Sequence, residues 1–291
     1  MYPPFCDTFI ITCIAYLHKK FKYILLEGNK TATITIKNLF GMAAFDFPKP
    51  VEVIKQAIQI ATDKDSYVLD FFSGSATTAQ AVMQQNVEDS GSRKFILVQL
   101  DELCDEKSDA YKNGYYTICE IGKERIRRAG EKIKQENPNS NIDVGFKVFR
   151  VSETNIKWNA VAKSHDLTLE DMQYTPDLMD FTLGANDVDI VYEVMLRQRD
   201  VALSEMLEQL SDIGNRTYLY ASSYLVCLET EITVELIKKL AELDPLPIKF
   251  IFRDSAFKDD IALKDETFRR LKALIEKNAG TDKPAYTVEF I

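Results

Sequence analysis

The sequence predicts an α/β protein, with a parallel sheet in its first half and a smaller α+β domain after it. Two short apolar segments, Tyr67–Phe72 and Lys94–Leu100, have the composition of buried strands. A small-residue loop and a helical segment from Thr77 to about Gln85 lie between them. This order is one βαβ unit, in which the two strands run parallel.

The segments before this unit are predicted from their periodicity. Phe21–Leu26 and Thr31–Ile36 are expected to be strands, the second because its residues alternate with period two. After Pro48 and Pro50, apolar residues recur at helical spacing, which predicts a helix over residues 51–61.

After the βαβ unit, a long helix is predicted over Tyr116–Gln135, because its isoleucines fall on one face. Val144–Val151 alternates and is predicted to be a strand that closes this region. A second domain begins near Asn155.

In the second domain we expect three helices and four strands. The helices are predicted over Val188–Leu210, Val234–Leu243 and Glu266–Lys277. The strands are predicted as a hairpin of Tyr218–Leu219 and Tyr224–Leu228 around Ala221, followed by Ile248–Phe252 and Tyr286–Ile291.

Composition and charge exclude several classes of protein. The net charge is -9, and nearly all of the acidic excess lies after residue 150, so nucleic-acid contact is expected only from the first half. The sequence contains no run of about eighteen apolar residues, the length needed to span a membrane. The short apolar stretch Phe9–Leu17 lacks the basic segment that precedes the apolar part of a signal peptide. The sequence has five cysteines without a CxxC pair and only two histidines, which offer few candidate ligands for a zinc site. An odd number of scattered cysteines fits a reducing cytoplasm.

The strongest functional signal is DFFSGSATTA at Asp70–Ala79, where the first strand ends and the next helix begins. A small-residue loop there lets the backbone approach a ligand, and the helix end offers free N–H groups. Its one glycine, Gly74, is too few for a GxGxxG fingerprint, and no P-loop lysine follows. By themselves these residues fit a phosphate, a dinucleotide pyrophosphate, the methionine part of S-adenosylmethionine, or a plain tight turn.

DFFSGSATTA resembles the DPFxGSGTT-type cofactor motif of amino-group DNA methyltransferases, and FDFPKP at Phe45–Pro50 resembles the motif that precedes it in the permuted β-type enzymes. RKFILVQLDE, GYYTICEIGKERIRRA, GFKVF and FRDSAFKDD resemble the modification subunits of type III restriction-modification systems. This resemblance covers residues 38–291. It implies a Rossmann-like, S-adenosylmethionine-dependent methyltransferase half-domain that acts on adenine in DNA, followed by the smaller α+β domain.

Carried onto this sequence, the resemblance implies a cofactor site with two walls. Asp70 would face the amino group of the cofactor, the loop after it would surround the methionine part, and Phe47 and Lys49 would form the opposite wall. A core position beside two prolines is the alternative for Phe47. The expected cofactor-binding residues are Phe47, Lys49, Asp70, Phe71, Phe72, Ser73, Gly74, Ser75, Thr77, Thr78, Gln99 and Asp101. No catalytic residue is assigned and no metal is expected.

The sequence departs from the family pattern at two places. Ala76 stands where the family has a second glycine; a methyl group there is tolerable if the backbone keeps a negative φ, but it narrows the approach and is expected to weaken cofactor binding. Where relatives end the second strand in a carboxylate for the ribose hydroxyls, this chain has Gln99, with Asp101 two residues on. Glutamine can accept the same hydrogen bonds without charge assistance.

The helix after the second strand carries a basic face of Arg125, Arg127 and Arg128, continued by two lysines. Contact with DNA is one interpretation. A solvated face paired with neighbouring glutamates is the favoured one.

A DPPY-type motif, which accepts the adenine amino protons and stacks on the flipped base, is expected before FDFPKP. The nearest string, YPPF at residues 2–5, matches it poorly. We therefore expect the C-terminal portion of such an enzyme, inactive alone. Residues 1–44 would be an N-terminal remnant or linker, residues 45–154 the cofactor-binding part, and residues 155–291 a C-terminal assembly domain.

The implied partners are DNA, through the complete enzyme, the nuclease-helicase restriction subunit and a second copy of the chain. Two alternatives stay open. One is a non-catalytic assembly module. The other is a nicotinamide-dependent oxidoreductase, disfavoured because the sequence has no glycine triplet and no acidic residue at the end of the second strand.

Overall fold

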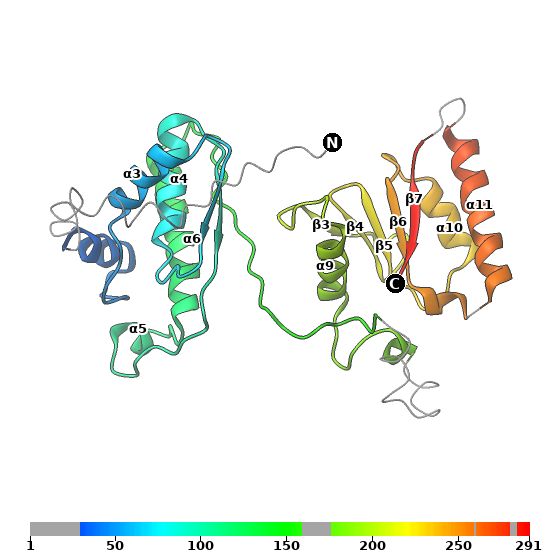
Figure 1. The fold of residues 1–291 in the computed structure, drawn as a ribbon, viewed down its shortest axis with the longest axis horizontal. Coiled ribbons are helices and arrows are strands. Elements are labelled where there is room, and N and C mark those ends of the chain that lie inside the picture. Colours follow the sequence, from blue (N-terminus) through cyan, green and yellow to red (C-terminus); the bar gives the residue numbers. More distant parts are fainter. Residues whose placement is uncertain (1–29, 159–175, 259, 280–283) are drawn as a thin grey trace. The chain divides into compact units, whose positions relative to one another are not determined.

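The computed structural model describes residues 30–158, 176–258, 260–279 and 284–291 (Figure 1). The chain divides into two compact units, Met1–Phe146 and Lys147–Ile291. Each has hydrophobic clusters of its own. Among the helices of the described ranges, none combines the length and the apolar content needed to cross a bilayer.

In the first unit, β1 (Tyr67–Asp70) and β2 (Lys94–Leu97) form a parallel pair, and α4 (Thr77–Asp89) connects them. The βαβ unit predicted from the sequence is confirmed. The predicted helices at residues 51–61 and 116–135 are also confirmed, as α3 (Val51–Ala61) and α6 (Ile118–Glu136).

Both of these helices pack on α4. Val51 and Ile58 of α3 share an apolar cluster with Val82 of α4. Ile126 and Ala129 of α6 share another cluster with Met83 and Ala79 of α4, and the short helix α5 (Asp109–Lys112) precedes α6. The start of α4, where the loop ends, is therefore held by packing along the rest of the helix.

Residues 30–40 are helical, so the strand predicted for Thr31–Ile36 is wrong. Ala32, Ile36 and Phe40 recur every four residues, and their side chains are 1%, 0% and 8% exposed. Ile36 and Phe40 pack in one cluster with Ile121 of α6. The threonine–isoleucine alternation favours a strand, but a strand propensity of about 1 kcal/mol is outweighed by burial of a whole helical face. The strand predicted for Phe21–Leu26 lies outside the described residues.

The strand predicted for Val144–Val151 is also wrong, because this described segment has no strand pairing. Val144 and Phe146 pack in the same cluster as Ile126 and Ala129 of α6, and Val151 is fully exposed. Alternate residues that pack on a helix show the same period as a strand, so the pattern could not distinguish the two.

The second unit contains a five-stranded sheet in sequence order. Its strands are β3 (Leu207–Gln209), β4 (Thr217–Tyr220), β5 (Tyr224–Cys227), β6 (Lys249–Phe252) and β7 (Thr287–Phe290). The first three run antiparallel, which confirms the hairpin around Ala221, and the last three run parallel. The parallel strands are connected through α10 (Val234–Ala241) and α11 (Ile261–Ala279). The expected α+β class therefore describes only the antiparallel half of this unit.

Helices cover both faces of this sheet. Phe250 and Phe252 of β6 cluster with residues of α10 and α11, while Ile251 between them clusters with residues of α9 (Asp187–Gln198), because successive strand residues point to opposite faces. The helix predicted over Val188–Leu210 is thus shorter than expected. Arg199 takes a φ of 60° and ends it, although apolar residues continue beyond that point.

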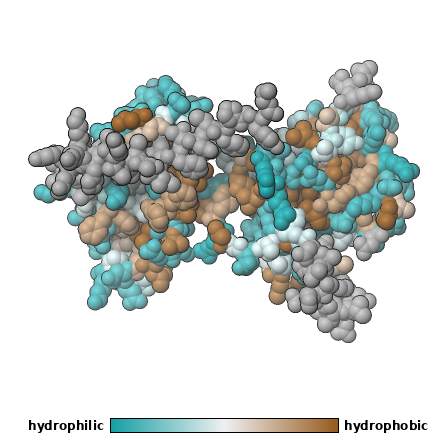
Figure 2. Space-filling view, viewed as in Figure 1, coloured by the Kyte–Doolittle hydropathy of each residue, from teal (hydrophilic) through white to brown (hydrophobic). Residues whose placement is uncertain are grey.

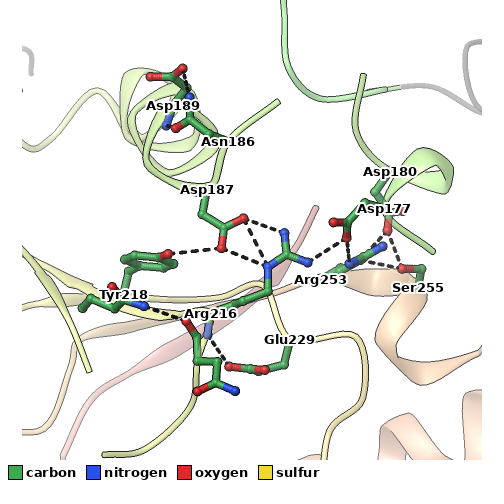
Figure 3. A network of polar contacts seen from close by, with 12 residues as sticks. Asp177, Asp180, Asn186, Asp187, Asp189, Arg216, Tyr218, Glu229, Arg253 and Ser255 are labelled. Atoms are coloured by element: carbon green, nitrogen blue, oxygen red, sulfur yellow. Dashed lines mark hydrogen bonds and ion pairs between the residues drawn. The ribbon is translucent and has the colours of Figure 1, made fainter. Parts of the chain in front are cut away.

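A polar network connects the 3-10 helix η1 (Pro176–Met179) and the residue after it to the sheet (Figure 3). Arg253, fully buried after β6, donates to Asp180 at 2.6 Å and to Asp177 at 2.5 Å. Arg216, before β4, donates to Asp177 at 2.7 Å and to Asp187 of α9 at 2.5 Å. Arg253 of the FRDSAF string therefore has a structural role. We call this network of Arg216 and Arg253 with Asp177, Asp180 and Asp187 the arginine clamp.

Candidate functional site

The loop 71–76 connects β1 to α4 and lies beside the end of β2. Val98 N donates to Asp70 O at 2.8 Å, and Ser73 N donates to Val98 O at 3.2 Å. The chain after β2 therefore holds the start of the loop, and the stretch singled out in the sequence is located at the carboxyl ends of two parallel strands. Ligands of parallel sheets bind at such ends.

Asp70 braces the loop against the helix. Its Oδ1 accepts from Phe72 N at 3.1 Å, and its Oδ2 accepts from the Thr78 hydroxyl at 2.6 Å. One carboxylate thus connects the last residue of β1, the loop and the first turn of α4.

Gln99 holds the centre of the loop. Its Oε1 accepts from Gly74 N at 2.8 Å, and its Nε2 donates to Leu100 O at 3.2 Å. The oxygen expected to serve the ribose hydroxyls thus also holds the loop, and Asp101 lies at an exposed position after it. Gly74 takes a φ of 50°, a conformation that suits glycine.

Ala76 does not have the negative φ that the sequence requires there for an alanine to be tolerated. Its φ is 61° and its ψ is 39°. It is the N-cap of α4 and offers no side-chain cap, so the first-turn N–H groups lack the usual side-chain acceptor. Gly122 of α6 lies against this point: a Cβ there would be 3.4 Å from Gly74 O and 3.6 Å from the Ala76 Cβ.

The aromatic residues of the two motifs differ in burial. Phe72 is 89% exposed and Phe71 is half-exposed. Phe47 is 86% exposed, so the alternative of a core position is wrong, and Lys49 is exposed beside it. Phe45 of the same FDFPKP motif is the residue that approaches the loop, with its ring 3.4 Å from the position of a Gly74 Cβ. Sequence reasoning did not identify Phe45.

Arg125 was assigned to a solvated face, and that assignment is wrong. Its side chain is fully buried and donates from Nη1 to the Ser75 hydroxyl at 2.8 Å and to the Thr77 hydroxyl at 2.6 Å. Its Nε donates to Gln80 Oε1 at 3.0 Å. Burial lowers the pKa of Arg125 to about 10, so the guanidinium is still charged at neutral pH.

Of the two neighbouring arginines, the exposed Arg127 follows the sequence interpretation, whereas Arg128 is half-buried and also donates to Leu39 O and the Tyr115 hydroxyl. Arg127 and Arg128 both bond to Glu124, at 3.4 Å and 2.6 Å.

The sequence holds one signal that separates Arg125 from Arg127 and Arg128, since it lies four residues after Ile121 and four before Ala129 on the predicted apolar face. This position puts it on the packed side of α6.

Residues 9–131 match the family model described as DNA methylase. The chain is 50% identical over 125 residues to the StyLTI Mod subunit of a type III restriction-modification enzyme from Salmonella typhimurium, which covers 43% of this chain and 19% of that protein. It is 33% identical over 257 residues to the EcoPI Mod subunit of Escherichia phage P1, covering 87% of this chain and 38% of that protein. It is 32% identical over 271 residues to the EcoP15I Mod subunit of Escherichia coli, covering 91% and 39%.

The chain is thus similar to DNA methylases over residues 9–131, and over most of its length to the modification subunits of type III restriction-modification enzymes. It spans less than two fifths of the length of the type III relatives that it matches. The residues matched by the methylase model include the loop, Gln99 and Arg125. The longer matches to the type III modification subunits extend into the second unit, because they exceed the length of the first.

Proposed function

We propose that this chain carries the S-adenosylmethionine site of an adenine-specific DNA methyltransferase, the modification subunit of a type III restriction-modification system. The observation that carries this proposal is the junction of β1, the loop and α4. There a glycine-containing loop precedes a helix whose N-terminus lacks a side-chain cap.

The residues present suit the amino-acid end of this cofactor. The uncapped N–H groups of α4 and the charge of Arg125 favour a carboxylate. Asp70 at the strand end favours an ammonium group. When bound, the cofactor supplies the methyl group that is transferred to the adenine amino group.

The remaining loop residues shape and cover the site. We assign the ribose hydroxyls to Gln99, whose Oε1 keeps a second lone pair beside its bond to Gly74, and to the carboxylate of Asp101. The exposed rings of Phe71 and Phe72 supply apolar contact, and Phe47 and Lys49 form the opposite wall.

Calorimetric titration of the chain with S-adenosylmethionine, and separately with NAD, tests this function. We expect weak but measurable binding of the methyl donor and none of NAD. Asp70→Ala should abolish it, whereas Asp65→Ala, which removes an exposed carboxylate in the turn before β1, should leave it unchanged. Affinity that survives Asp70→Ala undiminished would place the cofactor elsewhere, and NAD binding would favour the oxidoreductase.

We propose that residues 155–291 act as an assembly domain that contacts the restriction subunit or a second copy of the chain. The second unit has its own core and still exposes large apolar side chains. These include Leu183, Leu196, Met206, Ile248 and Ile261. Hydrophobic residues are visible among hydrophilic ones on the described surface (Figure 2). Such exposure on an acidic surface favours a protein partner over DNA.

Light scattering of the whole chain, alone and mixed with the restriction subunit, measures this assembly. The expected result is a mass above that of the 33.2 kDa monomer in at least one of the two samples. A strictly monomeric chain that does not bind the restriction subunit contradicts the assembly role.

A further inference from the structure

Arg125 is a buried cation that lacks a carboxylate partner within the described part of the chain. Its bonds go to the neutral oxygens of Ser75, Thr77 and Gln80. Among the described residues, its Nη2 is the buried side-chain nitrogen without a hydrogen-bond partner. A charge in this state is costly, because water has been removed and no opposite charge replaces it.

Arg253 in the second unit shows how this protein otherwise buries a guanidinium. It is as completely buried as Arg125, but Asp177 and Asp180 lie within 2.5 Å and 2.6 Å of it. The charge of Arg253 is therefore neutralised by carboxylates within the fold, whereas the described residues supply no carboxylate to neutralise the charge of Arg125.

The position of Arg125 adds to the positive potential at the loop. Thr77, which accepts from Arg125, is the first residue of α4, where the helix dipole is also positive. Ala76 supplies no cap there. Two sources of positive potential thus meet at one place, where low dielectric strengthens both.

We infer that Arg125 is a positioning residue whose buried charge is balanced by the carboxylate of the ligand, so that the loop selects adenosine compounds that carry an amino-acid end. It acts through the Ser75 and Thr77 hydroxyls and holds the loop around that carboxylate. This inference rests on the proposed function, and it adds a reason why the site prefers one class of adenosine ligand.

Two ligands differ by the amino-acid end that bears the carboxylate. S-adenosylhomocysteine carries it, whereas 5′-methylthioadenosine keeps the adenosine and the sulfur but lacks the amino-acid end. The decisive variant is Gln80→Glu, since Gln80 Oε1 lies 3.0 Å from Arg125 Nε and the substitution provides an internal carboxylate of the same shape.

We expect Gln80→Glu to weaken S-adenosylhomocysteine binding by about tenfold, the effect of one charge acting through the protein interior. Binding of 5′-methylthioadenosine should change by less than about twofold, because it presents no charge to the site. Gln84→Glu, one turn further along α4, makes the same change of charge and should leave both affinities unchanged. Arg125→Met should lose the preference for S-adenosylhomocysteine over 5′-methylthioadenosine. Arg125→Lys, which keeps the charge, should retain part of that preference.

Equal weakening of both ligands by Gln80→Glu, or no weakening of either, would show that Arg125 only shapes the loop and would overturn the inference. If Gln80→Glu fails to fold by circular dichroism, the comparison of Arg125→Lys with Arg125→Met decides. An equal loss of preference in these two variants then overturns the inference. If the unsubstituted chain binds neither ligand, the proposed function itself fails.

Discussion

At Ala76 the backbone adopts a conformation that an alanine side chain disfavours. Its φ of 61° lies in the left-handed region, where the Cβ crowds the carbonyl oxygen at a cost of about 1–2 kcal/mol. The side chain is buried against Gly122, so the strain is retained within a packed contact. This residue therefore offers a direct measure of the strain stored in the loop.

Ala76→Gly should lower the free energy of unfolding less than Ala81→Gly does, by a difference of at least about 1 kcal/mol. Only the first substitution relieves a left-handed conformation. Both residues are buried alanines, at the N-cap and in the interior of α4, so both variants lose a methyl group and gain chain entropy. Urea unfolding of the two variants gives the difference directly. Equal losses would show that the loop carries no strain at this position.

The arginine clamp sets the attachment of η1 to the sheet. Arg253→Met should lower the free energy of unfolding by about 3–5 kcal/mol, because it leaves the buried carboxylate of Asp180 without its guanidinium. Thermal or urea unfolding followed by circular dichroism measures the loss.

Lys258→Met, in the same region, is the matched control. Lys258 pairs with Glu231 at 3.2 Å, but both side chains are about two-thirds exposed, at 68% and 66%. An exposed pair of this kind contributes at most about 1 kcal/mol. A loss in Arg253→Met no larger than in Lys258→Met would mean that the arginine clamp does not stabilise the unit.

Acid should destabilise the second unit. Burial alone would raise the pKa of Asp177, but its bonds to Arg216 and Arg253 outweigh it and leave the pKa lowered. Bonds from Thr154 and Asn155 do the same for Glu193. A carboxyl whose folded pKa lies below its unfolded value stabilises the fold above the unfolded pKa, and this is lost as pH falls through the folded one.

The free energy of unfolding should therefore begin to fall below about pH 4.5 and continue to fall below pH 3.8, the ordinary values for glutamate and aspartate. Urea titrations between neutral pH and pH 3 measure this dependence, and Asp177→Asn should reduce its slope. A stability that rises toward pH 3 would contradict the assignment.

For the molecule as a whole, we expect no methyl transfer to DNA from these 291 residues alone. The sequence holds the proposed methyl-donor site but no DPPY-type string to accept the adenine amino protons and stack on the base. Incubation with labelled S-adenosylmethionine and DNA of mixed sequence measures the transfer. Incorporation above a blank without protein would contradict this expectation.

The sequence by itself determined the βαβ unit, the place of the loop and most elements of the second unit. These depend on local rules: short apolar strands, helical spacing after the prolines and a small-residue turn between strand and helix. DFFSGSATTA, together with FDFPKP and the motifs after it, also indicated the resemblance that the comparisons support. Such information lies within a few residues of chain and does not depend on distant contacts.

Only the tertiary structure decided how the segments Thr31–Ile36 and Val144–Val151 are buried and which oxygens accept hydrogen bonds. The same alternation that predicts a strand at Thr31–Ile36 contains the helical face that packs on Ile121. Gln99 is bonded to Gly74, 25 residues away, and Arg125 to Ser75, 50 residues away. Burial and hydrogen bonding between distant residues are set by packing, which a local pattern does not encode. For that reason the position of the loop could be predicted from the sequence, whereas the buried charge of Arg125, bonded to Ser75 and Thr77, could be found only in the folded structure.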